Sequence, residues 1–185
     1  MACDAWLVFE DEAGFTITPP TTRTWSRRGH PPIVRVHRRS RRRLSVAALL
    51  CYKPGHPTRL TYRPHVDRRP DGRKSFARTD YRDLLQSAPR QLGGNLVLVR
   101  DNVNTHLAAG MRNHIADRDR LVAYQLPPYA PDLHPVEGVW SILRHTALAH
   151  RAFAEPHELI TAVRRGPRLL QRRNDVLDGA SVAPD

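Results

Sequence analysis

The stretch Leu96-Val97-Leu98-Val99-Arg100-Asp101 decides the fold class, because four aliphatic residues in a row are followed directly by charged ones. Gly93-Gly94-Asn95 precedes it and predicts a break in the chain. A short apolar run bounded in this way is typical of a strand buried on both faces. The run from Ala5 to Phe9 is similar and leads into Glu10-Asp11-Glu12. If the two strands are parallel neighbours, Asp11 and Asp101 emerge at one edge of the sheet.

The elements expected around these two strands alternate in type. Further strands are expected at Pro32–Val36, Leu44–Tyr52, Arg59–Tyr62 (at a sheet edge) and Leu121–Gln125. Helices are expected from Thr79, as a cap, to Gln91, over Thr105–Asp117, and after Pro135 and Pro156, where proline suits a first helical position. This order predicts an α/β sandwich with a mixed central sheet flanked by helices.

Two of the expected helices carry an apolar face at helical spacing, which predicts where they pack against the sheet. The faces consist of Tyr81, Leu84, Leu85 and Ala88 in one helix, and of Val136, Val139, Trp140, Leu143 and Ala147 in the other.

Composition indicates one globular domain. The chain has 185 residues, of which 40% are hydrophobic and 26% charged. No apolar run is long enough to span a bilayer, and the N-terminus does not resemble a secretory signal. Cys3 and Cys51 are too few for a zinc site alone and are expected to be reduced thiols. We therefore expect a cytoplasmic protein.

The charge balance points to a polyanionic partner. The chain has 30 Lys and Arg against 18 Asp and Glu, a net charge of +12, and a basic domain of this kind favours nucleic-acid binding. An arginine-rich composition from a GC-rich genome is the alternative. Clustering argues against it, because the segment 23–43 contains nine arginines and no acid. These are Arg23, Arg27, Arg28, Arg35, Arg38, Arg39, Arg41, Arg42 and Arg43.

Three acids suit phosphodiester chemistry. Two divalent ions about 3.5 to 4 Å apart can activate a water and stabilise a leaving oxygen, and magnesium prefers carboxylate oxygens. Asp11 and Asp101 follow the two most buried strands, and Glu137 lies in the first turn of the helix after the proline-rich loop. The pattern alone leaves Glu12 as an alternative to Asp11, and Asp132 as an alternative to Glu137.

Several motifs resemble those of a known family. Asp101-Asn102-Val103-Asn104-Thr105-His106 resembles the Asp-Asn-x-x-x-His signature of bacterial insertion-sequence transposases of the mariner superfamily. The block from Leu126 to Trp140, LPPYAPDLHPVEGVW, is similar to the Leu-Pro-x-Tyr-Ser/Ala-Pro-Asp-Leu-Asn-Pro-Ile/Val-Glu-x-x-Trp block of that group. Phe9–Phe15, followed by Trp25 and Gly29, resembles its first-aspartate segment. The similarity covers about residues 6 to 175.

The resemblance implies a DDE transposase catalytic domain with a ribonuclease H-like fold, which cleaves DNA and transfers strands at insertion-sequence ends with two Mg²⁺ or Mn²⁺ ions. It implies Asp11, Asp101 and Glu137 as catalytic metal ligands, and the 35 residues between the last two agree with the group's spacing. Implied partners are transposon-end and target DNA at the bacterial nucleoid. A second copy of the chain and a separate N-terminal DNA-binding chain are further candidate partners.

The chain departs from the group's pattern at three places. Arg100 replaces a usually apolar residue before Asp101, and His134 replaces the usual asparagine before Pro135. The catalytic domain is expected at residues 1–175 with a weakly ordered tail at 176–185, and the N-terminal helix-turn-helix domain of the group is expected to be absent. Two alternative functions follow: a stand-alone ribonuclease H-like nuclease, or an inactive remnant that binds DNA only through its basic residues.

Candidate DNA contacts are the basic residues of the arginine cluster and two others. His106 could orient a ligand, contact DNA or bond to local backbone, and Arg144 could meet a phosphate or be solvated. The candidates are Arg27, Arg28, Arg38, Arg39, Arg41, Arg42, Arg43, His106 and Arg144.

Overall fold

A computed structural model gives a mixed five-stranded sheet with strand order β3-β2-β1-β4-β5. It describes residues 4–17, 26–30, 33, 43–66, 76, 78–101, 120–127, 131–149, 151, 153 and 155–180. The strands are β1 (Ala5–Thr16), β2 (Arg43–Tyr52), β3 (Arg59–Val66), β4 (Asn95–Arg100) and β5 (Leu121–Gln125). β2 is antiparallel to β1 and β3, whereas β4 is parallel to β1 and β5. The predicted mixed sheet is confirmed.

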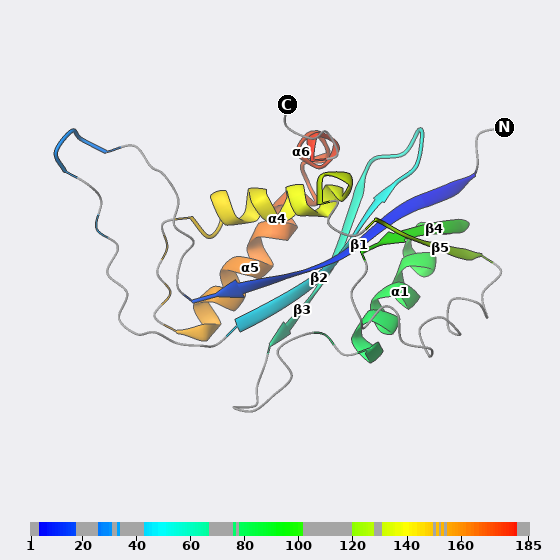
Figure 1. Cartoon of the computed structure of the whole chain (residues 1–185), viewed down its shortest axis with the longest axis horizontal. Coiled ribbons are helices and arrows are strands. Elements are labelled where there is room, and N and C mark those ends of the chain that lie inside the picture. Colours follow the sequence, from blue (N-terminus) through cyan, green and yellow to red (C-terminus); the bar gives the residue numbers. More distant parts are fainter. Residues whose placement is uncertain are drawn as a thin grey trace.

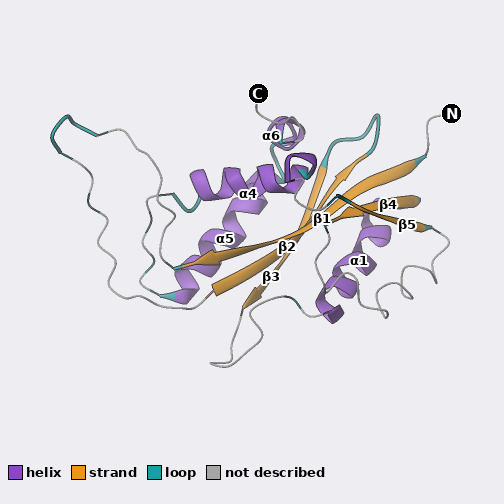
Figure 2. Ribbon diagram, in the orientation of Figure 1, coloured by secondary structure: helices purple, strands orange, loops and turns teal. Residues whose placement is uncertain are grey.

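Helices cover both faces of this sheet (Figures 1 and 2). α1 (Arg78–Leu92) packs on one face, and α4 (Pro135–His145) and α5 (Pro156–Leu170) pack on the other. A 3₁₀ turn, η1 (Pro131–Leu133), leads into α4, and α6 (Asn174–Gly179) follows α5. The strand expected at 32–36 lies outside the described residues apart from Ile33, and the helix expected at 105–117 lies wholly outside them.

Alternation along β1 assigns its side chains to two separate cores. Trp6 and Val8 belong to the core under α1, while Ala13 and Phe15 belong to the core under α4 and α5. Successive side chains of a strand point to opposite faces, so odd-numbered residues of β1 face α4. Asp11 therefore lies on the α4 side of the sheet.

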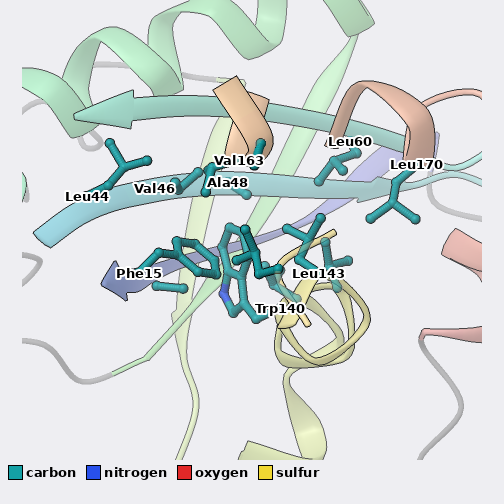
Figure 3. Packing of buried hydrophobic residues seen from close by; sticks show 14 of the residues in the cluster. Phe15, Leu44, Val46, Ala48, Leu60, Trp140, Leu143, Val163 and Leu170 are labelled. Atoms are coloured by element: carbon teal, nitrogen blue, oxygen red, sulfur yellow. The ribbon is translucent and has the colours of Figure 1, made fainter. Parts of the chain in front are cut away.

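The core under α4 and α5 is built on aromatic packing (Figure 3). The rings of Phe15 and Trp140 meet edge to face, with centroids 6.0 Å apart, a favoured geometry for aromatic pairs. The predicted face of α4 is confirmed at Val136, Val139, Trp140 and Leu143, all buried, and Ala147 is half-buried just beyond the helix.

The predicted face of α1 is also confirmed, but the predicted cap is wrong. Tyr81, Leu84, Leu85 and Ala88 are all buried. The helix begins at Arg78, so Thr79 lies inside its first turn. At the other end, Gly93 and Gly94 have φ angles of +69° and +75° and end the helix as predicted, because left-handed backbone favours glycine.

The expectation that Asp11 ends the first strand is wrong, because β1 continues to Thr16. The parallel partner β4 pairs only as far as Glu10, but the antiparallel partner β2 continues the ladder to the pair Thr16–Arg43. Burial of Ala13 and Phe15 under α4 stabilises this extension. Asp11 thus lies within a continuous strand.

The expectation of a weakly ordered segment from residue 176 is wrong for residues 176–180. Residues 174–179 form α6, and Leu177 is fully buried in the core under α4 and α5. The helix end approaches α4 so closely that a Cβ added to Gly138 would lie 2.8 Å from the carbonyl oxygen of Ala180. The sequence pattern did not predict this helix, because only two of its six residues, Val176 and Leu177, are apolar and pack against the core.

The described segments contain no helix that is both long and apolar enough to cross a lipid bilayer. Cys51 is a free thiol and is buried against α1. Cys3 lies outside the described residues.

Substituting Leu177→Ala tests whether α6 is part of the fold. We expect a loss of about 2 to 4 kcal/mol in the free energy of unfolding, measured by urea denaturation, because the change leaves a cavity in the core. The matched control is Leu169→Ala, whose side chain is 52% exposed. It should change the stability by less than about 0.5 kcal/mol. Equal effects of the two substitutions would show that α6 is not packed.

Candidate active site

The strand register brings Asp11 and Asp101 together. The last parallel pair between β1 and β4 is Glu10–Arg100, and the next residue on each strand is an aspartate. Both aspartates are one residue past that pair, so they lie on the same side of the sheet, the side of α4. Asp11 is only 7% exposed, and Asp101 is half-buried. The prediction that parallel pairing places both acids at one edge agrees with this register.

Two hydrogen bonds fasten the α4 region to β1 around Asp11. The indole Nε1–H of Trp140 donates to Asp11 Oδ2 at 2.7 Å. The Nε2–H of His134, the residue before α4, donates to the carbonyl oxygen of Glu10 at 3.1 Å. The backbone N–H of Glu12 donates to the other carboxylate oxygen of Asp11 at 2.8 Å. The Asp11 carboxylate is therefore fixed on both oxygens.

Glu137 lies on α4, the helix that the hydrogen bond of Trp140 holds against Asp11. It is exposed in the first turn and lies three residues before Trp140, so both project from the same side of the helix. The pKa of Asp11 is raised from 3.8 to about 7, first by burial and then by the negative charge of Glu137, with a smaller effect of Asp101. The three carboxylates thus share one electrostatic environment.

The two alternative acids lie elsewhere. The carboxylate of Glu12 accepts a hydrogen bond from the hydroxyl of Tyr81 at 2.6 Å, and Tyr81 belongs to the core on the α1 side of the sheet. Asp132 is exposed in η1, ahead of α4. Glu12 therefore points to the opposite side of the sheet from Asp11, and Asp132 precedes α4 rather than lying in its first turn.

The donor chemistry of this group fits divalent cations. Within the described ranges, no three histidine, cysteine, aspartate or glutamate side chains are placed to hold one ion jointly. Magnesium, however, commonly takes only one or two carboxylates and completes its shell with water. A buried Asp11 that is disfavoured as an anion beside Glu137 and Asp101 gains most from a nearby cation. The carboxylate donors therefore suit a hard divalent cation.

A second polar layer lies behind the acids, on the α1 side of the sheet. Glu10 and Arg100 are cross-strand partners, 1% and 4% exposed. Burial lowers the pKa of Arg100, while the charges of Glu10 and Asp101 oppose this shift. Burial and the hydrogen bond to Glu12 raise the pKa of Tyr81. Sequence reasoning missed this layer, although a charged residue directly before each aspartate was a visible signal.

The candidate DNA contacts are only partly described. Arg27 and Arg28 are exposed in the segment 26–30. Arg144 is half-buried, with its guanidinium 5.9 Å from the centre of the Phe15 ring, so it is not simply solvated. Arg43 begins β2, and only its backbone is described. The remaining candidates lie outside the described residues: Arg38, Arg39, Arg41, Arg42 and His106.

A family model described as DDE superfamily endonuclease matches residues 6–160, which contain all three acids. The chain belongs to the DDE superfamily endonuclease family. Its fold is also that of solved transposase structures. The Mos1 transposase paired-end complex with left transposon end has a TM-score of 0.61 at 16% identity, and the match covers 95% of this chain and 55% of that one. The expected ribonuclease H-like fold is confirmed for this DDE chain.

Two further similar proteins are a solved structure, which shares the fold, and a sequence relative of part of the chain. The crystal structure of the catalytic domain of Mos1 mariner transposase has a TM-score of 0.53 at 13% identity, covering 97% of this DDE chain and 84% of the other. An uncharacterized protein, y4pE/y4sA, of Sinorhizobium fredii (strain NBRC 101917 / NGR234) is 30% identical over 69 residues, or 37% of this chain and 48% of the relative. The chain spans about half the length of that relative and of the Mos1 paired-end complex chain.

The raised pKa of Asp11 predicts a pH-dependent stability in the absence of metal. The folded-state pKa of about 7 lies above the unfolded value near 3.8, so the folded chain holds the proton more tightly. The stability from this group is complete below pH 4 and is lost as the pH rises through 7, by on the order of 4 kcal/mol.

Urea denaturation in EDTA between pH 4 and 8 measures this effect. Asp11→Asn, which cannot ionise, should show a flatter pH profile and greater stability than the native chain at pH 8. Adding Mg²⁺ at pH 8 should stabilise the native chain more than the variant. Identical pH profiles for the two proteins would contradict the burial of a titrating Asp11.

Substituting Trp140→Phe removes the donor to Asp11 while keeping an aromatic ring. We expect the pKa of Asp11 to rise further, because the lost hydrogen bond favoured the ionised carboxylate. The free energy of unfolding should fall by about 1.5 to 3 kcal/mol. Carboxyl ¹³C NMR titration reports the pKa directly. The control Trp6→Phe alters a buried indole in the other core and should leave the Asp11 titration unchanged.

Proposed function

We propose that this chain is the catalytic domain of a DDE transposase from a bacterial insertion sequence, cleaving DNA at the element's ends and transferring the strands to a target. Membership of the DDE superfamily endonuclease family supports the class of reaction. The observation that carries the proposal is the hydrogen bond by which Trp140 of α4, three residues after Glu137, meets Asp11 beside the parallel pairing of β1 and β4. The raised pKa of Asp11 agrees with it.

Asp11, Asp101 and Glu137 are the proposed catalytic and metal-binding residues. They would hold two Mg²⁺ or Mn²⁺ ions, which when bound activate a water or a 3′-hydroxyl and stabilise the leaving oxygen. The chain itself supplies rigidity. The N–H groups of Trp140 and Glu12 fix both oxygens of Asp11, and the sheet register fixes the backbone of Asp101 beside it. Groups held in this way need little reorganisation during the reaction.

The names of the similar structures support the partners and cofactors. One is titled a Mos1 mariner paired end complex with Mn, another a paired end complex with Mg, and a third a Mos1 strand transfer complex. By analogy, we propose transposon ends and target DNA as partners of this chain. A homodimer and a separate N-terminal DNA-binding chain are further proposed partners. The enzyme would act on nucleoid DNA in the cytoplasm.

Substituting Asp101→Asn tests the catalytic role. The fold should persist, checked by circular dichroism, because a half-buried carboxylate is replaced by an amide of the same shape. Metal-dependent nicking of supercoiled DNA should fall by more than about 100-fold, since a charged ligand is lost. Asp132→Asn is the matched control in the neighbouring 3₁₀ turn and should nick normally. Unchanged nicking by the Asp101 variant would refute the assignment.

Two further measurements separate the proposed transposase from its alternatives. Incubation of the native chain with pre-cut transposon-end DNA and a target plasmid should give joined products, whereas a stand-alone nuclease would give only cleavage. Calorimetric titration with Mn²⁺ should detect binding that Asp101→Asn weakens. An inactive DNA-binding remnant would show neither metal binding at the acids nor cleavage.

A further inference from the structure

The outer face of α5 is strongly basic. Arg164, Arg165 and Arg168 lie in α5, Arg172 lies in the turn just after its C-cap Gln171, and all four are exposed. The inner face of the same helix is apolar, with Leu159, Val163 and Leu170 in the core (Figure 3 labels Val163 and Leu170). We call the four arginines the α5 basic surface.

Internal contacts do not account for this surface. Among the described residues, none of its four arginines forms an ion pair, whereas the nearby Arg173 is paired with Asp175 at 2.8 Å. Arg164 and Arg168 are four residues apart within α5, and like charges at this spacing destabilise a helix by about 0.2 to 0.5 kcal/mol per pair. A helix dipole favours cations only in the last turn, so it explains Arg168 but not Arg164 or Arg165.

We propose that the α5 basic surface binds the phosphate backbone of duplex DNA. Guanidinium groups match phosphate oxygens in a two-pronged geometry, and they form the surface without any acid between Arg164 and Arg173. Arg164 and Arg168 are about 6 Å apart along the axis of α5, and Arg172 follows two residues after the end of the helix. Duplex DNA carries one negative charge per about 1.7 Å of its axis, so the spacing between Arg164 and Arg168 alone corresponds to about three to four phosphate charges.

The α5 basic surface lies on the solvent side of a helix that is packed firmly on its other side. At Gly166, which is buried against α4, an added Cβ would lie 2.5 Å from Leu143 Cδ2 and 3.2 Å from Ala147 Cβ. Arg164 and Arg168 are each two residues from Gly166, so they project from the opposite side of the helix. This packing holds the exposed arginines on a fixed support.

This inference rests on the proposed function, because DNA is the polyanion that a transposase must hold. The surface lacks an accompanying apolar face that would favour insertion into an anionic membrane, since Leu169 is the only large hydrophobic residue of the described part of α5 that is strongly exposed. Its arginines are also separate in the sequence from the basic cluster at 23–43. Contacts to phosphates carry no sequence information, so the surface would hold DNA without selecting a site.

The salt dependence of DNA binding tests the proposal. The variant R164Q/R168Q/R172Q removes three arginines of the surface, and R82Q/R90Q/R120Q removes three exposed arginines from α1 and the start of β5. Both lower the net charge by the same amount. Affinity for a duplex without transposon ends is measured in EDTA at several salt concentrations, by fluorescence anisotropy. Each lost phosphate contact makes the slope of log K against log salt less steep by about 0.9.

We expect the slope of the α5 variant to be shallower than that of the native chain by about 2 to 3, and the slope of the α1 and β5 variant to be nearly unchanged. A native slope in the α5 variant would overturn the proposal, as would equal changes in both variants, which would show an effect of net charge alone. Loss of binding to phosphatidylserine vesicles without loss of DNA binding would also overturn it. Because EDTA removes catalysis, failure here is distinguishable from failure of Asp101→Asn to abolish nicking.

Discussion

The hydrogen bond from Trp140 to Asp11 is the contact on which the candidate site depends. It joins residues 129 positions apart and is buried, so its loss would leave a carboxylate in the core without its strongest neutral donor. The same indole packs against Phe15, four residues further along β1 in the core of the same face. One side chain thus fixes how α4 sits on β1. The place of Glu137, three residues earlier, follows from that docking.

Near the end of the pairing between β1 and β4, different charged residues lie on the two faces of the sheet. On the α4 side, acids of like charge gather where a cation can compensate them. On the α1 side, Glu10 and Arg100 are buried as cross-strand partners of opposite charge. Buried charges of opposite sign add little net stability, yet removing one partner leaves the other uncompensated. The strands that carry Asp11 and Asp101 are therefore coupled by charge on the opposite face as well as by their backbone ladder.

Much of the fold follows from sequence periodicity, and the errors have physical causes. Val136, Val139, Trp140 and Leu143 repeat at helical spacing and mark a buried face without ambiguity. The end of β1 was misplaced because Asp11 interrupts an apolar run, and only the partner strand shows that pairing continues. The role of Trp140 was underestimated as packing alone, since a pattern locates an indole in a core without revealing which oxygen its N–H meets. The basic surface of α5 was overlooked, although three arginines four residues apart were visible in the sequence.

The close approach of Gly138 to Ala180 limits which relatives can share this arrangement. A hydrogen is the largest substituent that fits at position 138 while Ala180, just after α6, remains against α4. A homologue with alanine or a bulkier residue directly after its third acid must place its C-terminal segment differently. The residue at this position can therefore indicate, from sequence alone, which family members pack the segment after α6 against α4 in this way.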